Sequence, residues 1–530
     1  MASGSVSDPS FIRQPFQRQH WQVILLTTAV AAVLRMWNLG EWSLWVDEAH
    51  TWRDATMPFF GEGGFMDEQR RLYPLSFLLL RFLFGVDVLG FDEWSLRLPF
   101  ALIGILTVPL LAICGRRFVG PWSAVIAACL LAVNPWHIFW SQNARFYGMV
   151  VLGSVLVMHR LHVLFESGRA KDLLLATAFV VLAAGSHPTA FALVISFVCF
   201  LIVRPVLRTR YGAFMIVVLA LLLIVTVPWM IRQSELFSDF LDSKSTLAPM
   251  HWLETVGYYF RPSMIVAVLL GLVVAPGLLG ANRALYLTCM VVVPVIAFSA
   301  IGSMLVKVTA RYAICVLPAV TLLAGLLITY LAHRLREAPG LPRMAAWLLS
   351  AAFPVVLFAD YIQLDVAYFT EQNGQRGKWR EASNFVLEEA AARGFRGVRL
   401  LTGNAPTSLY YMRRRHWFVG DTDPYPDINV QPLLSWRFRT GRENGSVMHA
   451  PGVEPHFEWH QKIAKRNDQL FAVAVTLPEL RELDRTWENP DLNGQFEAVL
   501  VRDFELVMHL PVWIGPKNES IYLYLPKKVD

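Results

Sequence analysis

Charged side chains are scarce in this chain of 530 residues. Asp, Glu, Lys and Arg make up 17% of it, whereas a soluble domain usually has about a quarter, and hydrophobic residues make up 55%. This composition excludes a disordered, fibrous or ordinary cytosolic protein and predicts a polytopic membrane protein with some soluble mass. The net charge of +6 is assigned first to loop cations that face cytoplasm and anionic lipid, because no segment has the pattern of a nucleic-acid-binding module.

Cysteine is also rare, and its positions matter more than its number. None of the five cysteines lies in residues 361–530, so a disulfide framework and a cysteine-based zinc site are excluded there. All of them fall within apolar runs, at Cys114, Cys129, Cys199, Cys289 and Cys315. These positions indicate small buried side chains.

The long apolar runs lie almost entirely in residues 1–360. A membrane-spanning helix needs roughly 20 mostly apolar residues, and the sequence predicts about eleven such spans. They are 21–38, 96–114, 122–140, 148–165, 172–186, 188–203, 212–231, 262–280, 284–302, 312–331 and 343–360. The spans on either side of His187 are short and meet at Gly185-Ser-His-Pro188, which is typical of a tight turn. No small-residue cleavage site follows the first span, which indicates a retained anchor.

Basic residues fall in every second predicted loop and set the expected orientation. Those loops contain Arg116, Arg117, Arg169, Lys171, Arg204, Arg208, Arg210, Arg283, Arg334, Arg336 and Arg343. We therefore expect the N-terminus in the cytoplasm and the C-terminal segment outside, in a bacterial inner membrane. Segment 73–85 is apolar enough for a further span, but that span would reverse the charge pattern, so an interfacial or re-entrant helix is favoured.

Residues 361–530 have the pattern of an ordinary α/β domain. A helix is predicted at 378–392, and a short helix follows Gly403-Asn-Ala-Pro406 and runs through Met412. Strands are predicted at 398–401, 416–419, 471–475, 496–501 and 521–525. The expected organisation is a transmembrane domain of residues 1–360, with a first exterior loop at 39–95, followed by an exterior domain of residues 361–530. The latter has no phosphate-binding glycine loop and no nucleophile elbow.

Two acidic residues lie between tryptophans directly after the first predicted span, in Leu39-Gly-Glu-Trp-Ser-Leu-Trp-Val-Asp-Glu-Ala49. An aromatic belt at the membrane interface explains the tryptophans without function. It does not explain Asp47 and Glu48, because desolvating carboxylates at a membrane surface is costly. A carboxylate in a partly dehydrated aromatic pocket is suited to general-base catalysis. The alternative is a pair of acids that cap and begin a helix, and the motif alone does not decide between the two.

Two further outer segments combine cations with polar side chains. In segment 134–148, Ser-Gln-Asn at 141–143 precedes Arg145, whose planar fork suits a phosphate. At the entry of a later span, Lys307 and Arg311 flank a threonine. Anchoring to lipid headgroups is the competing explanation for both, and it is favoured for Arg145 taken alone.

Taken together, these segments resemble one family, the family-39-like C-type glycosyltransferases. That group includes protein O-mannosyltransferases, lipid A aminoarabinose transferases and bacterial galacturonosyltransferase-like enzymes. Lys378-Trp-Arg-Glu-Ala382 is also similar to the start of the exterior domain in bacterial members. The other matching segments are Arg35-Met-Trp-Asn-Leu-Gly40, Val46-Asp-Glu-Ala49, Phe91-Asp-Glu-Trp-Ser-Leu-Arg-Leu-Pro99, Ser141-Gln142 with Ala144-Arg145 and Tyr147, and Arg311-Tyr312 with Pro318.

The resemblance implies a polyprenyl-phosphate-linked sugar as donor, reaction on the outer face and inversion at the anomeric carbon. By the same analogy Asp47 is the catalytic base and Glu48 supports it. The expected ligands of the donor phosphate are Arg145, Lys307 and Arg311. The expected lining of the substrate pocket is Trp42, Trp45, His50, Asn143, Tyr147 and Tyr312.

One position departs from the family pattern. Many bacterial relatives have Glu where this chain has Asn143, and losing that carboxylate weakens a metal-bridged phosphate, since hard cations prefer anionic oxygen ligands. We therefore expect no metal and no other cofactor, because the lipid-linked sugar is a substrate.

The layout itself suits a transferase that works outside the cell. No nucleotide sugar is available there, and a phosphate leaving group needs no general acid, so one base and one or two cations suffice. The acceptor is a hydroxyl of an envelope lipid or glycan, or of a protein. The alternatives are a lipid-linked glycan transporter or flippase, which predicts ionisable residues at mid-membrane depth and an internal repeat, and a non-catalytic glycan receptor.

Overall fold

The computed structural model describes residues 14–60, 73–85, 92–204, 249–304, 310–413, 427–433, 442–443, 446–447, 453–476, 495–514 and 517–527, with single residues 90, 212 and 220. Its contacts divide the chain into two compact units. The helical unit comprises Met1–Trp37, Phe59–Leu80 and Arg97–Asp365, and the sheet unit comprises Asn38–Pro58, Arg81–Leu96 and Val366–Asp530. Much of the first exterior loop thus belongs with the C-terminal segment, whereas the division at residue 360 stays a prediction.

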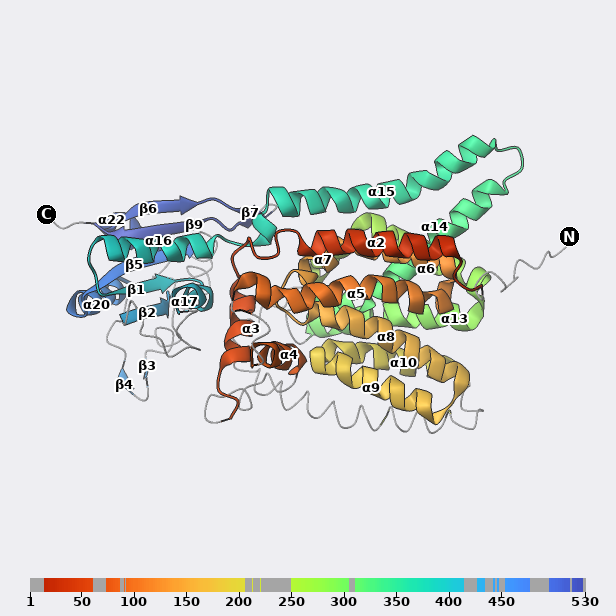
Figure 1. The fold of residues 1–530 in the computed structure, drawn as a ribbon, viewed down its shortest axis with the longest axis horizontal. Helices are drawn as coiled ribbons and strands as arrows, with labels where there is room; N and C mark the ends of the chain where they lie inside the picture. Colours follow the sequence, from red (N-terminus) through yellow and green to blue (C-terminus); the bar gives the residue numbers. More distant parts are fainter. Residues whose placement is uncertain are drawn as a thin grey trace. The chain divides into compact units, whose positions relative to one another are not determined.

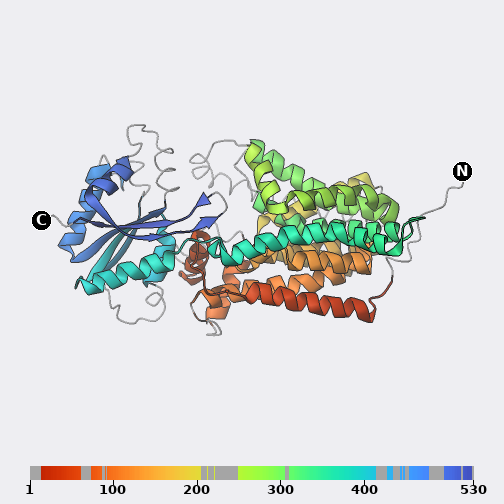
Figure 2. The same ribbon diagram turned by 90° about the horizontal axis from the view of Figure 1, so that it is seen from above.

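Helices make up the helical unit, and the long ones run side by side in both ribbon views (Figures 1 and 2). The helices are α2 (Arg18–Met36), α5 (Glu93–Val119), α6 (Pro121–Ala132), α7 (Pro135–Ser141), α8 (Tyr147–Ser167), α9 (Ala170–Ser186), α10 (Phe191–Val203), α12 (Pro249–Phe260), α13 (Pro262–Met304), α14 (Leu317–Arg336) and α15 (Arg343–Thr370). The short 3₁₀ helices η2 (Pro188–Ala190) and η4 (Ala310–Val316) connect several of them. The helix expected at 73–85 is α4 (Leu75–Gly85).

The helices coincide with the predicted apolar spans, except that 212–231 falls almost entirely outside the described residues. Among the described residues, five helices are long and apolar enough to cross a membrane, or six if α6 and α7 form one bent span. The expected count of about eleven spans is therefore not confirmed. The predicted pair 262–280 and 284–302 appears as α13, which is broken where Gly280 has a φ of 74°.

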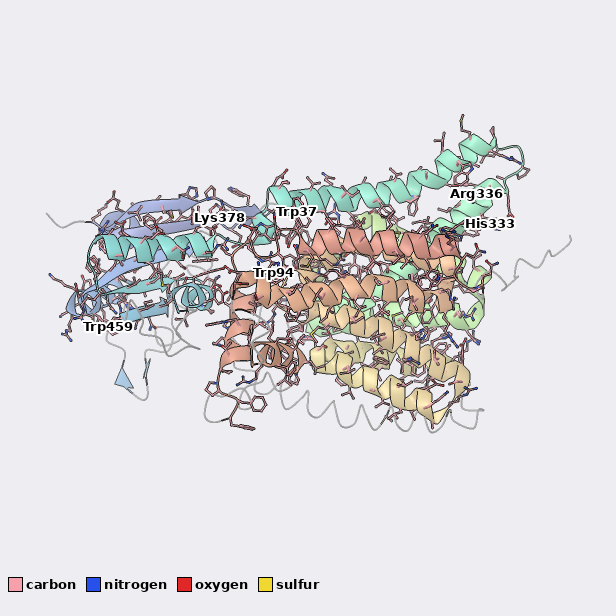
Figure 3. The ribbon with its side chains drawn as sticks, in the orientation of Figure 1. Trp37, Trp94, His333, Arg336, Lys378 and Trp459 are labelled. Carbon is pink, nitrogen blue, oxygen red and sulfur yellow. The ribbon has the colours of Figure 1, made fainter. Side chains whose placement is uncertain are left out.

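Close packing around α14 shows where the centre of the helical unit lies. In the apolar 18-residue window of the candidate span that contains α14, 83% of the residues are buried. Gly325 lets α14 approach α6, since a Cβ there would collide with the Ser123 carbonyl. Figure 3 shows Trp37 at one end of α2 and His333 and Arg336 near the end of α14 that lies at the opposite side of the unit. Residues expected on opposite sides of the membrane therefore lie at opposite ends.

The predicted span 122–140 is a broken helix. Helices α6 and α7 meet at an angle of 61°. Asn134 caps the second helix, because its Oδ1 accepts a hydrogen bond from the His137 N–H at 2.8 Å. Pro135 occupies the first position of α7, where its missing N–H costs no hydrogen bond.

A five-stranded mixed sheet forms the centre of the sheet unit, in the order β2-β1-β5-β9-β6. The strands are β1 (Gly397–Thr402), β2 (Asp427–Pro432), β5 (Gln469–Thr476), β6 (Phe504–Leu510) and β9 (Ile521–Pro526). Strand β1 pairs in parallel with β2 and β5, in registers such as Gly397 opposite Gln469, whereas β9 runs antiparallel to β5 and β6. Every residue of β1 and β5 is buried, as expected for strands covered on both faces.

Helices cover both faces of this sheet (Figure 2). Helix α16 (Trp379–Ala392) packs on one face, while α20 (Val453–Arg466) and α22 (Gln495–Asp503) share a core with Phe471, Val473 and Val475 on the other. The predicted strands 398–401, 471–475 and 521–525 and the two predicted helices are confirmed. Helix α17 (Ala405–Arg413) is the second of these helices.

One strand prediction is wrong and another lies outside the described residues. Segment 496–501 belongs to α22, because Phe496, Val499 and Leu500 recur at helical spacing and pack together on the core. The strand predicted at 416–419 falls outside the described residues. Strands β2 and β6 were not predicted.

Candidate active site

Arg145 and Arg311 come together around His187 in the helical unit. Arg145 lies between α7 and α8, Arg311 lies in η4, and His187 lies in the turn between α9 and η2. The His187 ring stacks on Phe146 at 4.4 Å between ring centroids and on Tyr312 at 5.9 Å. Two of the expected cations, far apart in sequence, thus meet at one aromatic side chain.

The electrostatics of this cluster follow from burial and from the two guanidinium groups. Burial, and then the charges of Arg145 and Arg311, lower the pKa of His187 to about 3 from its ordinary 6.5. The imidazole is therefore neutral at physiological pH, and the arginines supply the positive charge. His187 Nδ1 accepts a hydrogen bond from the Thr189 N–H at 3.3 Å, which confirms the expected turn histidine.

Aromatic rings complete the surroundings of the two arginines. Tyr147 lies 5.9 Å from His187 between ring centroids, and Tyr73 lies 5.4 Å from it. The guanidinium of Arg145 lies 4.6 Å from the centre of the Phe146 ring. Of the predicted pocket residues, Tyr147 and Tyr312 are therefore brought to the arginines.

The Ser-Gln-Asn segment before Arg145 binds backbone carbonyl groups. Ser141 Oγ donates to the His137 carbonyl at 2.6 Å, and Asn143 Nδ2 donates to the Phe139 carbonyl at 2.5 Å. Gln142 Nε2 donates to the Trp37 carbonyl at 2.7 Å, which attaches the end of α7 to the end of α2. These contacts fix the loop that carries Arg145, and they assign Asn143 a structural role in the described geometry.

Arg35 secures the same junction from within α2. Its fully buried guanidinium donates to the Ala132 carbonyl at 2.9 Å and the Leu131 carbonyl at 3.1 Å, and lies 2.6 Å from His137 Nδ1. It therefore satisfies the carbonyl groups that the break after α6 leaves open. This contact explains why an arginine stands inside an apolar helix, where an isolated charge would be costly.

The acidic pair of the first loop begins helix α3 (Val46–Thr56) in the sheet unit. Asp47 is partly exposed, whereas Glu48 is fully buried. Glu48 Oε2 accepts a hydrogen bond from the Trp45 N–H at 3.4 Å. The same oxygen forms an ion pair with Arg376 Nε at 3.3 Å. Both acids thus lie in the first turn, where the helix dipole favours negative charge. Acids that begin a helix were the alternative to a catalytic pair, and this position does not exclude catalysis.

The remaining residues of the expected pocket, Trp42, Trp45 and His50, lie in the sheet unit. Trp42 is buried against Tyr368 at 5.1 Å between ring centroids. Trp45 directly precedes α3. His50 lies three residues after Asp47, so the Asp47 and His50 side chains share one face of the helix. Lys307 lies outside the described residues.

His187 and Arg376 are functional candidates that the sequence did not reveal. The His-Pro step between two short spans was a signal for a turn, but no sequence pattern indicates the two arginines beside it. Among the described residues, no three His, Cys, Asp or Glu side chains lie close enough together to hold a metal ion.

The chain matches a family model and several solved structures. The model described as dolichyl-phosphate-mannose-protein mannosyltransferase matches residues 74–231. ArnT from Cupriavidus metallidurans bound to undecaprenyl phosphate has a TM-score of 0.51 and 14% identity, over 96% of this chain and 98% of that chain. No curated protein matches the sequence significantly.

Two archaeal structures show the same fold. The Archaeoglobus fulgidus oligosaccharyltransferase tethered to an acceptor peptide with the NVT sequon has a TM-score of 0.54 and 10% identity, over 97% of this chain and 74% of that chain. AglB from Archaeoglobus fulgidus, in complex with an inhibitory peptide and a dolichol-phosphate, has a TM-score of 0.52 and 12% identity, over 87% and 69%.

The fold defines a polytopic helical membrane protein with a C-terminal sheet domain. Residues 74–231 are thus similar to a mannosyltransferase family, and the chain shares its fold with ArnT and the archaeal oligosaccharyltransferase.

Proposed function

We propose that the protein is an inverting glycosyltransferase that moves a sugar from a polyprenyl-phosphate donor to a hydroxyl group on the outer face of the membrane. The acceptor is an envelope lipid, a glycan or a protein. The family match over residues 74–231 and the fold shared with ArnT bound to undecaprenyl phosphate support this proposal. In it the N-terminus is cytoplasmic, the sheet unit is exterior and the membrane is a bacterial inner membrane.

The meeting of Arg145 and Arg311 at His187 carries the proposal. The charges of both guanidinium groups act on the same imidazole, which burial and these charges keep neutral. A phosphate anion bound beside them accepts charge-assisted hydrogen bonds from both guanidinium groups. Arginine at such a site also matches the planar arrangement of phosphate oxygens better than lysine does.

The proposed reaction needs one base and a stabilised leaving group. The base removes the proton of the acceptor hydroxyl, and the oxygen attacks the anomeric carbon from the side opposite the phosphate. The bond between the anomeric carbon and the phosphate oxygen breaks, and polyprenyl phosphate leaves with the electron pair. Attack from the opposite side inverts the anomeric carbon. The arginines stabilise the charge that develops on the leaving phosphate.

The environments of the two acids distinguish their proposed roles. A general base must come within hydrogen-bond reach of the proton that it removes. Asp47 is partly exposed, whereas Glu48 is fully buried and ion-paired with Arg376. We therefore assign Asp47 as the base and Glu48 as its support. No step requires a metal or cofactor, since the phosphate is a stable anion.

The test is transfer by membranes that contain the protein, with a panel of radiolabelled polyprenyl-phosphate sugars separated by thin-layer chromatography. We expect label to leave one donor and appear in a hydroxyl-bearing acceptor, with release of unlabelled polyprenyl phosphate. Control membranes lack the protein. Movement of intact labelled donor across the bilayer, without cleavage, would instead establish the transporter alternative.

A further inference from the structure

The first exterior loop and the segment that leads into the exterior domain are joined by a buried ion pair. Glu48 and Arg376 have fully buried side chains, and Arg376 Nε lies 3.3 Å from Glu48 Oε2. Arg376 Nη1 donates to the Gly374 carbonyl at 2.6 Å and to Tyr368 Oη at 3.3 Å. Burying two charges is costly unless both are paired and hydrogen-bonded, and here both are.

An unusual backbone presents Arg376 to this pair. Three consecutive residues have left-handed φ angles, 48° at Asn373, 61° at Gly374 and 58° at Gln375. Residues other than glycine and asparagine rarely adopt this conformation, so Gln375 is the least favourable of the three. A Cβ at Gly374 would collide with the Trp42 ring, so only glycine allows the turn to approach the first loop. Strain of this kind persists only where surrounding contacts hold it in place.

A second arginine binds the same loop four residues later. The Arg380 N–H donates to Ser43 Oγ at 3.0 Å, and Ser43 Oγ donates to Glu381 Oε2 at 3.2 Å. The Arg380 guanidinium donates to the Gly40 carbonyl and to Glu93 Oε1, each at 3.3 Å, and also to the Glu41 carbonyl. The loop before α3 is therefore bound to the first turn of α16.

Helix α17 makes a third attachment. The Leu44 N–H donates to Tyr411 Oη at 2.7 Å, and the Trp52 and Tyr410 rings meet edge to face at 5.1 Å between centroids. The segment of residues 40–52 is thus held on both sides of Asp47 by residues of the C-terminal segment.

We propose that Arg376 is a positioning residue that, through Glu48, fixes the first turn of α3 and so sets the place of the base Asp47. This inference rests on the proposed function. It assigns the exterior domain a direct part in the reaction, because its leading segment holds the loop that carries the base. Arg380 and Tyr411 hold the flanking residues, and Arg376 acts at the residue next to Asp47.

The first test measures transfer kinetics in Arg376→Ala, Arg376→Lys and the matched control Arg393→Ala. Arg393 lies at the end of α16 and pairs only with Glu389 among the contacts described for it. We expect Arg376→Ala to lower turnover by tenfold or more with little change in the donor KM, and Arg376→Lys to lie between. Added guanidinium should partly restore Arg376→Ala, because it can occupy the vacated site.

A double-variant cycle separates action through Glu48 from a general effect on folding. If Arg376 acts through Glu48, Arg376→Ala combined with Glu48→Gln should be no slower than the slower single variant. Effects that multiply, or a donor KM that rises as much as turnover falls, would overturn the proposal. So would unchanged turnover in folded Arg376→Ala.

Amide hydrogen exchange of the full-length protein tests the attachment without any sugar transfer. We expect exchange of residues 44–56 to accelerate at least tenfold in Arg376→Ala and to stay unchanged in Arg393→Ala. Unchanged exchange in Arg376→Ala would overturn the attachment. If the wild-type protein transfers no sugar, the proposed function fails, and a catalytic role for Arg376 fails with it. The exchange result then decides the attachment alone.

Discussion

Arginines serve opposite purposes in the two units of this protein. In the helical unit, Arg145 and Arg311 gather around a neutral histidine, so positive charge is concentrated. In the sheet unit, Arg376 and Arg380 meet the carboxylates Glu48 and Glu93, so charge is neutralised. Two guanidinium groups near one another favour an anion, whereas a buried ion pair holds chain segments together. The comparison distinguishes the proposed phosphate site from the proposed attachment, although both are made of the same residue type.

The largest effect is expected from removing the base. Asp47→Asn keeps the shape of the side chain but removes the proton acceptor. Turnover should fall by on the order of a hundredfold or more, with donor affinity little changed. Glu48→Gln should be milder, because it retains a hydrogen-bond acceptor for Arg376. Steady-state rates at equal folded amounts check this. Near-native turnover in Asp47→Asn beside an inactive Glu48→Gln would reverse the two roles.

The next largest effect is expected from removing either arginine of the proposed phosphate site. Arg145→Ala and Arg311→Ala should each lose roughly 1.5–3 kcal/mol of interaction with the phosphate, on the order of tenfold to a hundredfold in donor kcat/KM. Arg145→Lys should restore only part of this, since a point charge lacks the planar fork.

Arg336→Ala is the matched control for these arginine variants. Arg336 lies 4.0 Å from the Trp347 ring centre, near the end of the helical unit opposite Trp37, and its removal should leave donor kinetics unchanged (Figure 3). Normal donor kinetics in both Arg145→Ala and Arg311→Ala would show that these arginines do not bind the donor phosphate, and would favour anchoring to lipid headgroups.

A smaller effect follows from the lowered pKa of His187. The folded chain binds this proton only near pH 3, whereas the unfolded chain binds it near the ordinary pKa of 6.5. Stability is therefore lost as the pH falls from about 6.5 toward 3, by up to about 2 kcal/mol at pH 5 from this one group. In detergent without donor, the Tm of His187→Phe should fall less between pH 7 and pH 5 than the Tm of the wild type does.

The exposed His333 provides the control for this measurement, because His333→Phe should keep the wild-type acid sensitivity. Equal acid sensitivity in His187→Phe and the wild type would show that burial and the two arginines do not lower the pKa of His187.

The smallest effect is expected from chelation. Asn143 cannot supply an anionic ligand, and hard cations prefer carboxylate oxygen. Transfer rates should therefore change by less than about twofold when EDTA is added. Loss of activity in EDTA, restored by manganese or magnesium, would implicate Asp47 or Glu48 as a metal ligand. The acids would then help to bind the phosphate through a metal, and the arginines would not bind it alone.

Local pattern was sufficient for most secondary structure. The apolar runs of α5 and α8 and the buried strand β5 are visible in the sequence, because their periodicity and length report on which face is buried. Segment 496–501 was ambiguous for the same reason, since a short apolar run suits a strand or a helix. Strand β6 was missed because its residues after Phe504 are mostly exposed or half-buried.

The sequence by itself determined that this is a membrane protein with an α/β tail, and it singled out Asp47, Arg145 and Arg311 as candidates. Only the tertiary structure decided which of these residues meet. His187 joins Arg145 and Arg311 from a separate turn, and Glu48 pairs with Arg376 across 328 positions of the chain. Periodicity and capping act over a few residues, whereas these contacts depend on how whole helices pack, which no local pattern records.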